Sequence, residues 1–136
     1  MENEKTILVV EIVEDEASIT NVVADKLHNE GFSVLKAKNG QEGLDVAKEK
    51  HPDLILLDIK MPVMNGLDML KVLRTDEWGQ TVPVIVLSNL SDTETIAEAI
   101  DKNTFEYFVK ADTKLQEVIE KIKQKLGIPS PAAPQE

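Results

Sequence analysis

The chain has 136 residues, no cysteine and a formal net charge of -10. This length suits a single domain with one core, and the absence of cysteine excludes disulfides, thiolate metal sites and a cysteine nucleophile. The acidity argues against direct binding of nucleic acid, and no apolar run approaches the length of a membrane span, so we expect a cytoplasmic domain without membrane contact.

Short apolar runs alternate with amphipathic segments along the whole chain. Runs rich in branched residues predict strands, and apolar residues recurring at helical spacing predict the helices between them. The predicted strands are Ile7–Val13, Phe32–Ala37, Leu54–Leu57, Val82–Leu87 and Phe105–Val109. A helix is predicted after each strand from apolar residues at helical spacing, which include Val23 and Leu27 before Gly31, Leu44 and Ala47, Leu67 and Leu70 after Gly66, Ile96 and Ile100, and Val118 and Ile122.

Pairs of residues typical of helix starts support this division. Asn39 with Glu42 opens the second helix, Ser91 with Glu94 opens the fourth, and Thr113 with Gln116 opens the fifth. Residues 1–126 are therefore expected to form one domain, and the proline-rich residues 127–136 a disordered tail or the start of a linker.

Five strand–helix units in succession predict an α/β fold. Right-handed crossovers then place helices on both faces of a parallel sheet. The expected architecture is a flavodoxin-like (βα)5 three-layer sandwich with strand order 2-1-3-4-5. In such a sheet the ligand site lies at the carboxyl ends of the strands, where the order reverses.

Polar residues follow the predicted strands at that edge. Glu14 and Asp15 end the first strand, Asp58 the third, Ser88 the fourth and Lys110 the fifth. Clustered carboxylates repel one another, and a hard divalent cation such as Mg²⁺ removes that penalty. A carboxylate can also act as a nucleophile toward phosphorus, with a lysine and a hydroxyl holding the phosphoryl oxygens.

Four segments resemble the receiver domain of two-component response regulators. They are Val-Glu-Asp-Glu (13–16), Leu-Ile-Leu-Leu-Asp-Ile-Lys-Met-Pro-Val-Met-Asn-Gly (54–66), Pro-Val-Ile-Val-Leu-Ser (83–88) and Tyr-Phe-Val-Lys (107–110). The resemblance covers residues 6 to about 126. The resemblance implies that the domain is a phosphoacceptor switch and not a metabolic enzyme. Such a domain catalyses only its own phosphorylation and dephosphorylation.

The resemblance also implies a role for each site residue. Asp58 is the phosphoacceptor and, with Asp15, Glu14 and the backbone carbonyl of Lys60, a ligand of Mg²⁺. Two further residues, Ser88 and Lys110, contact the phosphoryl group. Ser88 is also paired with Tyr107 as the switch. The implied partners are a sensor histidine kinase or phosphotransfer protein and a downstream output protein or domain.

Other functions remain open on the residues alone. Each site residue taken singly has an ordinary explanation as a helix cap, a turn or a solvated charge. A module of the same fold that is never phosphorylated is one alternative. A metal-dependent aspartyl phosphatase is another, although it would favour an acid at the position of Lys60. A flavin-binding protein is disfavoured because no phosphate-binding loop is visible.

Two departures from the family pattern concern the neighbourhood of the site. Glu11 interrupts the first strand, which predicts either that Glu11 lies at the exposed start of a strand that overhangs the sheet or that a bulge turns it outward. Ala111 follows Lys110 where the family usually has proline. A trans peptide bond is expected there, because the cis form is costly before any other residue.

Overall fold

The computed structural model describes residues 5–10, 19–58, 66–88, 106–109 and 114–127, and the structural statements below concern these residues. The strands are β1 Thr6–Val10, β2 Ser33–Ala37, β3 Leu54–Asp58, β4 Val84–Ser88 and β5 Glu106–Val109. The helices are α1 Ile19–Asn29, α2 Gly40–Lys50, α3 Gly66–Leu73, the short 3-10 helix η1 Trp78–Gln80, and α5 Leu115–Lys125. Within these ranges no helix combines the length and apolar character needed to cross a bilayer.

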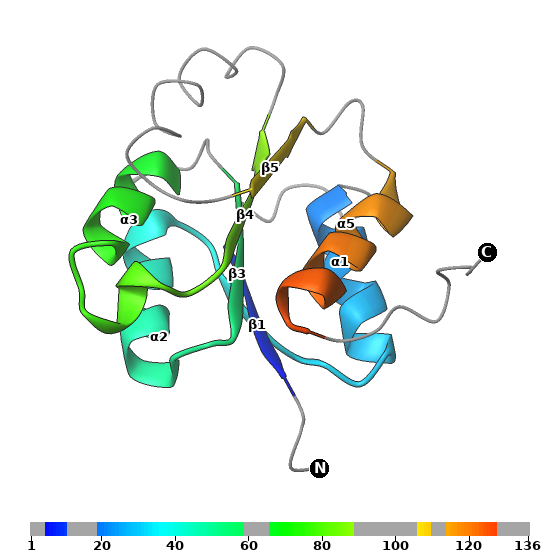
Figure 1. Cartoon of the computed structure of the whole chain (residues 1–136), viewed down its shortest axis with the longest axis horizontal. Helices are drawn as coiled ribbons and strands as arrows, with labels where there is room; N and C mark the ends of the chain where they lie inside the picture. Colours follow the sequence, from blue (N-terminus) through cyan, green and yellow to red (C-terminus); the bar gives the residue numbers. More distant parts are fainter. Residues whose placement is uncertain (1–4, 11–18, 59–65, 89–105, 110–113, 128–136) are drawn as a thin grey trace.

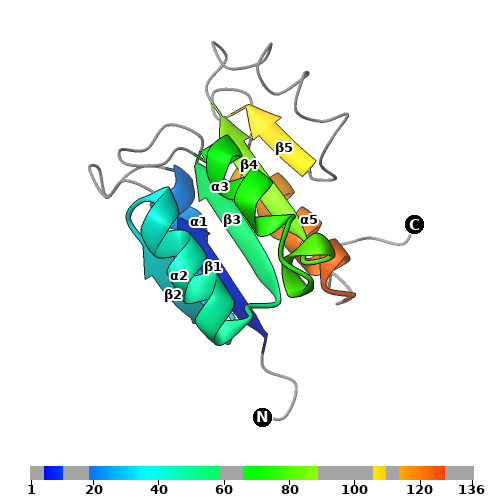
Figure 2. The ribbon, with the colours of Figure 1, turned by 90° about the vertical axis from the view of Figure 1, so that its left-hand side faces the viewer.

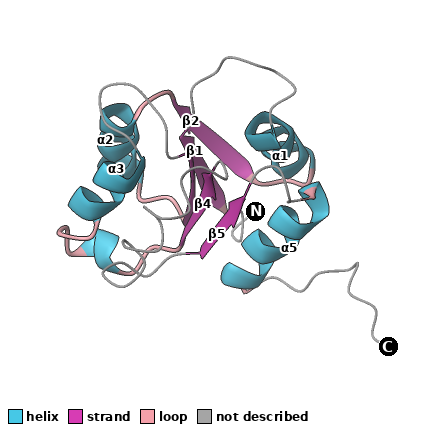
Figure 3. Ribbon diagram, turned by 90° about the horizontal axis from the view of Figure 1, so that it is seen from above, coloured by secondary structure: helices cyan, strands magenta, loops and turns pink. Residues whose placement is uncertain are grey.

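The five strands form one sheet in the order β2-β1-β3-β4-β5, which confirms the predicted topology. Each neighbouring pair is parallel, so all strands end at the same edge, as the arrowheads of β3, β4 and β5 show in Figure 2. The helices lie in two layers. Figures 1 and 3 show α2 and α3 on one face of the sheet and α1 and α5 on the other.

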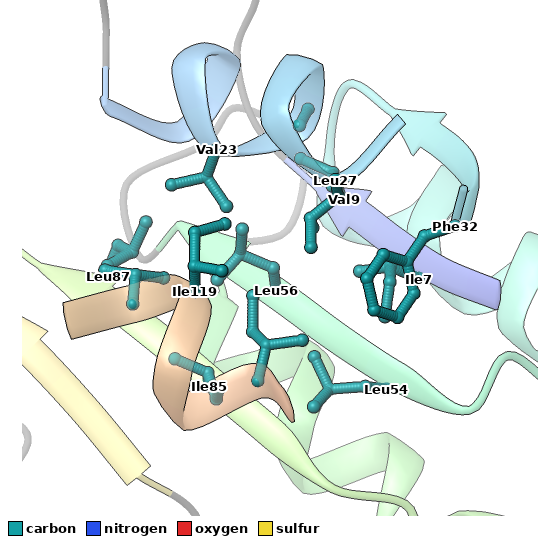
Figure 4. Close-up of a cluster of buried hydrophobic side chains, with 13 residues drawn as sticks. Ile7, Val9, Val23, Leu27, Phe32, Leu54, Leu56, Ile85, Leu87 and Ile119 are labelled. Carbon is teal, nitrogen blue, oxygen red and sulfur yellow. The ribbon is translucent and has the colours of Figure 1, made fainter. Parts of the chain in front are cut away.

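Alternating strand residues supply two separate cores. In β1, Leu8 faces the α2–α3 layer, whereas Ile7 and Val9 face the α1–α5 layer. The same alternation holds in β3 and β4 (Figure 4). Both faces of the central strands are therefore buried, which explains why β3 and β4 are continuous apolar runs and not alternating ones.

The second helix begins as predicted. The side chain of Asn39 accepts a hydrogen bond from the backbone amide of Glu42 at 2.8 Å, and the Glu42 carboxylate accepts one from the amide of Lys38 at 2.8 Å. At the other end of α2, His51 has a left-handed backbone with φ 48°, and its ring stacks on that of Trp78 with centroids 4.5 Å apart. The stack connects the end of α2 to η1.

The predicted cap of the last helix is wrong. The helix starts at Leu115 with Lys114 at the N-cap, and the Glu117 carboxylate accepts a hydrogen bond from the Lys114 amide at 3.0 Å. Gln116 instead donates to Glu120 at 3.2 Å. A carboxylate at a helix N-terminus also interacts favourably with the helix dipole, which a neutral glutamine amide does not.

Two sequence predictions about whole elements are only partly tested. The first strand was expected to reach Val13, but the described strand ends at Val10, and residues 11–13 lie outside the described ranges. The described strand begins at Thr6, and Glu11, which both alternatives concern, lies outside the described residues. The helix expected after Ser91 and the Lys110–Ala111 bond also lie outside the described residues.

An ion pair connects the end of α1 to α5. The Nζ of Lys123, a buried residue of α5, lies 2.6 Å from Oε1 of Glu30, and the Nζ of Lys26 lies 3.4 Å from Oε2. The hydrogen bond from Lys123 holds the pKa of Glu30 below its ordinary value of 4.5. The contact therefore favours the folded state wherever Glu30 is ionised.

We expect Glu30→Gln to lower the free energy of unfolding by about 0.5–1 kcal/mol at neutral pH. A lowered folded-state pKa means that the contribution of Glu30 is fully present above pH 4.5 and is lost as the pH falls through the folded-state value. Urea unfolding of both proteins at neutral pH and at several values below 4.5 tests this. Glu49→Gln, on the exposed side of α2, is the charge-matched control, and a pH-independent difference would contradict the prediction.

Candidate functional site

The central feature of the site is Asp58, the last residue of β3. All five residues of this strand are buried, and Asp58 itself is 8% exposed. Asp58 and Lys123 are the two buried residues with charged side chains in the described part of the chain. Burial of a carboxylate is unfavourable unless other groups compensate its charge. A carboxylate kept at the end of a central strand therefore indicates a functional position.

The strand register shows what lies at the level of Asp58. Leu57 is opposite Val10 of β1, and Asp58 itself is opposite Leu87 of β4. Ser88 follows Leu87 and is opposite Val109, the last residue of β5. The ends of β1, β3, β4 and β5 therefore form one edge, with Asp58 in the middle of it.

The structure describes only part of the predicted site. Asp58 is described fully, whereas Ser88 and Tyr107 are described as backbone positions, with Tyr107 opposite Val86. Glu14, Asp15, Lys60 and Lys110 lie outside the described residues. The convergence of all these side chains therefore stays a prediction.

Asp58 by itself suits a hard cation. Its carboxylate supplies oxygen, the ligand atom that Mg²⁺ prefers. No group of three or more His, Asp or Glu side chains that could hold a metal ion is found within the described ranges. Any further carboxylate ligands of such an ion would lie outside the described residues.

Comparison with known families decides the identity of this fold. The sequence pattern of the response regulator receiver domain matches residues 10–123, which is most of the chain. The chain belongs to this family. The resemblance seen in the four sequence segments is confirmed, and the protein is a receiver domain of the kind found in two-component signalling.

Known relatives of this receiver domain include proteins of two lengths. The polar-differentiation response regulator DivK of Brucella suis is 34% identical over 118 residues, which cover 87% of this chain and 95% of DivK. The DNA-binding response regulator MtrA of Mycobacterium tuberculosis is 31% identical over 115 residues, which cover 85% of this chain. The receiver domain spans only about half, 49%, of the length of MtrA.

Solved structures give the same result for the fold. The receiver domain of the Francisella response regulator 1452 superposes with a TM-score of 0.78 at 26% identity and covers 91% of this chain and 98% of its own. The receiver domain of the sensor histidine kinase PA1611 from Pseudomonas aeruginosa has a TM-score of 0.77 at 25% identity, with the same coverage. In that protein a magnesium ion is coordinated in the active site cleft.

One acidic residue near the end of the first strand, Glu11, lies outside the described residues. Glu11 was regarded as an interruption of the first strand, but the described pairing of β1 ends one residue before it. The sequence contains a short repetition here, because two apolar residues precede Glu11 and two more precede Glu14. The family match begins at residue 10, the last residue of β1.

Proposed function

We propose that this receiver domain accepts a phosphoryl group on Asp58 from a phosphohistidine of a sensor histidine kinase or phosphotransfer protein. A carboxylate oxygen of Asp58 attacks the phosphorus atom, the P–O bond forms, the P–N bond breaks, and the imidazole of the donor leaves. The observation that carries the proposal is a buried carboxylate at the end of the central strand, in a chain of the receiver family.

The proposal includes a Mg²⁺ site. Asp58, Asp15, Glu14 and the backbone carbonyl of Lys60 would hold the ion, which supplies positive charge against the carboxylates and the phosphoryl oxygens. The magnesium ion in the PA1611 receiver domain supports this proposal. Lys110 and Ser88 are proposed to bind the remaining phosphoryl oxygens, because a cation and a hydroxyl donor stabilise the charge that develops there.

Phosphorylation is proposed to change a surface that a downstream output protein or domain binds. A population shift involving Ser88 and Tyr107 would transmit the change, since Ser88 ends β4, the neighbour of the Asp58 strand, and Tyr107 lies on β5, the next strand beyond it. The domain acts as a switch in the cytoplasm and catalyses no reaction beyond its own phosphorylation and dephosphorylation. We propose residues 1–126 as the domain and 127–136 as a tail or the start of a linker.

The test of this function is intact-protein mass spectrometry after incubation with acetyl phosphate and Mg²⁺. The wild-type chain should gain one phosphoryl group, and Asp58→Asn should gain none because the nucleophilic oxygen is lost. Asp45→Asn on the exposed side of α2 is the matched control and should be labelled like the wild type.

Two outcomes would contradict the assignment in different ways. Equal labelling of the wild type and Asp58→Asn would place the phosphoryl group elsewhere. A wild-type chain that remains unlabelled, both by acetyl phosphate and by phosphorylated histidine donors, would favour a receiver-fold module that works without phosphorylation.

A further inference from the structure

Lys123 is a buried lysine that the proposed phosphoryl transfer does not use. It lies in the second half of α5, is 9% exposed, and its Nζ lies 2.6 Å from Oε1 of Glu30. Its neighbours on the helix, Ile119 (labelled in Figure 4) and Ile122, are fully buried in the α1–α5 core. A lysine is almost never buried this deeply unless it is paired, so the contact with Glu30 allows Lys123 to occupy this position.

Glu30 is itself held in place at the end of α1. Its backbone amide donates to the carbonyls of Lys26 and Leu27 at 3.0 and 3.1 Å, where the chain turns from α1 toward β2. The Nζ of Lys26 lies 3.4 Å from Oε2 of Glu30. Both carboxylate oxygens therefore face a lysine, and Glu30 is a fixed point to which α5 is attached.

Stability alone does not explain a lysine at this position. A buried ion pair often stabilises a protein no more than well-packed apolar side chains of similar volume, because both charges must be removed from water. An apolar residue at position 123 would extend the apolar face that Val118, Ile119 and Ile122 already form. The best-attested role of buried polar groups is to specify one register among several, and the contacts of α5 fit this role.

The apolar side chains of α5 do not by themselves define its position along its axis. Those in the core recur every three or four residues, at positions 115, 118, 119, 122 and 126. A slip by one turn, about 5–6 Å, would place most of them on one another and would separate Lys123 from Glu30. In one direction it would also put the ammonium group where Ile119 lies, among apolar side chains, which is strongly unfavourable. The ion pair therefore distinguishes registers that the apolar contacts do not.

The register of α5 matters because a short connection joins this helix to β5. That strand ends at Val109, opposite Ser88 of β4, and α5 begins at Leu115. Five residues join these two points, and the first of them is Lys110, the proposed ligand of the phosphoryl oxygens. Residues 110–113 lie outside the described ranges, but both ends that they connect are described. A slip of α5 would move one end of the segment that carries Lys110.

We propose that Lys123 is a positioning residue for phosphoryl transfer. Through its ion pair with Glu30 it holds α5 in one register on α1, and α5 in turn fixes one end of the connection that carries Lys110. Lys123 acts through the helix and not by contact with the reacting atoms. The inference rests on the proposed function, because it requires that Lys110 binds the phosphoryl group that Asp58 accepts.

The rate of phosphoryl incorporation from acetyl phosphate, followed by intact-protein mass spectrometry over a range of Mg²⁺ concentrations, tests the proposal. Lys123→Met keeps a long unbranched side chain and removes the charge. We expect it to lower the maximum rate about tenfold, because small errors of position are costly in catalysis. The Mg²⁺ concentration that gives half the maximum rate should stay within about twofold, because none of the proposed ligands of the ion lies between β5 and α5.

Further variants separate positioning from charge and from stability. Lys123→Arg keeps the cation and should retain a rate within about threefold of the wild type. Lys48→Met removes an equal charge from the exposed side of α2 and should leave the rate within about twofold. The urea midpoint of Lys123→Met should not fall, because Glu30 keeps Lys26 as a partner and no buried charge is left unpaired. A lower midpoint together with a rate that arginine does not restore would overturn the positioning role.

Amide hydrogen exchange of the full chain, without any phosphodonor, tests the register separately from the reaction. In Lys123→Met the amides of α5 should exchange about tenfold faster while those of α2 are unchanged, because the helix has lost the contact that holds its position. In Lys48→Met, α5 should exchange as in the wild type. Unchanged exchange of α5 in Lys123→Met would overturn the role of the ion pair.

These outcomes distinguish failure of this inference from failure of the proposed function. If the wild type is labelled on Asp58 and Lys123→Met is labelled as fast as Lys48→Met, only the role of Lys123 is overturned. If the wild type stays unlabelled by acetyl phosphate and by histidine donors, or Asp58→Asn is labelled equally, the proposed function fails and the role of Lys123 in phosphoryl transfer fails with it. Hydrogen exchange then still decides whether Lys123 holds the register of α5.

Discussion

Chelation of divalent cations should stop phosphorylation of this receiver domain by acetyl phosphate. The Asp15→Asn variant should be phosphorylated only at a much higher Mg²⁺ concentration than the wild type requires. The reason is electrostatic. Attack by an anionic carboxylate on an anionic phosphoryl group, next to further carboxylates, is strongly opposed unless positive charge is present. Loss of a direct ligand should weaken apparent Mg²⁺ affinity about tenfold to a hundredfold.

The rate of phosphoryl incorporation, measured as a function of Mg²⁺ concentration, gives this affinity for each variant. Glu16→Gln is the closest control, because it removes an equal charge from the residue next to Asp15. We expect Glu16→Gln to have little effect, since Glu16 is not among the proposed ligands. A comparable loss in both variants would falsify the assignment of Asp15 as a direct ligand.

Gly79→Ala should be strongly destabilising, by about 3 kcal/mol or more. A Cβ atom at this position would lie 2.1 Å from the backbone oxygen of Leu73 and 3.0 Å from its backbone carbon. Leu73 is fully buried at the end of α3, so its backbone cannot move away without disturbing the α2–α3 core.

The surrounding loop has little room to adjust to the extra atom. One guanidinium nitrogen of Arg74, Nη1, donates to the carbonyl of Gly79 at 2.7 Å and to the carbonyl of Val82 at 2.9 Å. The amide of Gly79 also donates to the carboxylate of Asp76 at 3.3 Å. A shift of Gly79 would therefore disturb the turn that leads from α3 into β4.

Urea unfolding of Gly79→Ala and Gly31→Ala distinguishes two causes of lost stability. One is the clash of a Cβ atom with the backbone of Leu73, and the other is a left-handed backbone conformation. Gly31 has φ 98°, and a Cβ atom built there would have nothing within 4 Å. Its replacement should cost about 1–2 kcal/mol, from the left-handed conformation alone. Equal losses in the two variants would contradict the predicted contact between Gly79 and the backbone of Leu73.

The general fold followed from patterns that are local in the sequence. Apolar runs such as Leu54–Leu57 and the capping pair of Asn39 and Glu42 depend on neighbouring residues, and alternating strands and helices restrict the topology to a few possibilities. The strand-end position of Asp58 followed in the same way, because it ends an apolar run. These features could be predicted because each depends on residues close together in the chain.

Other features depend on contacts between segments that are far apart in the chain. The sequence offers two glutamates after two similar apolar pairs, and only pairing with β2 and β3 selects residues 6–10 as the strand. The ion pair of Glu30 and Lys123 and the approach of Gly79 to Leu73 have no local pattern either. The sequence therefore determined the order of the elements and the position of Asp58. Tertiary packing decided which residues of the first apolar segment pair in the sheet, because these strand pairs and core contacts join residues that are far apart in the chain.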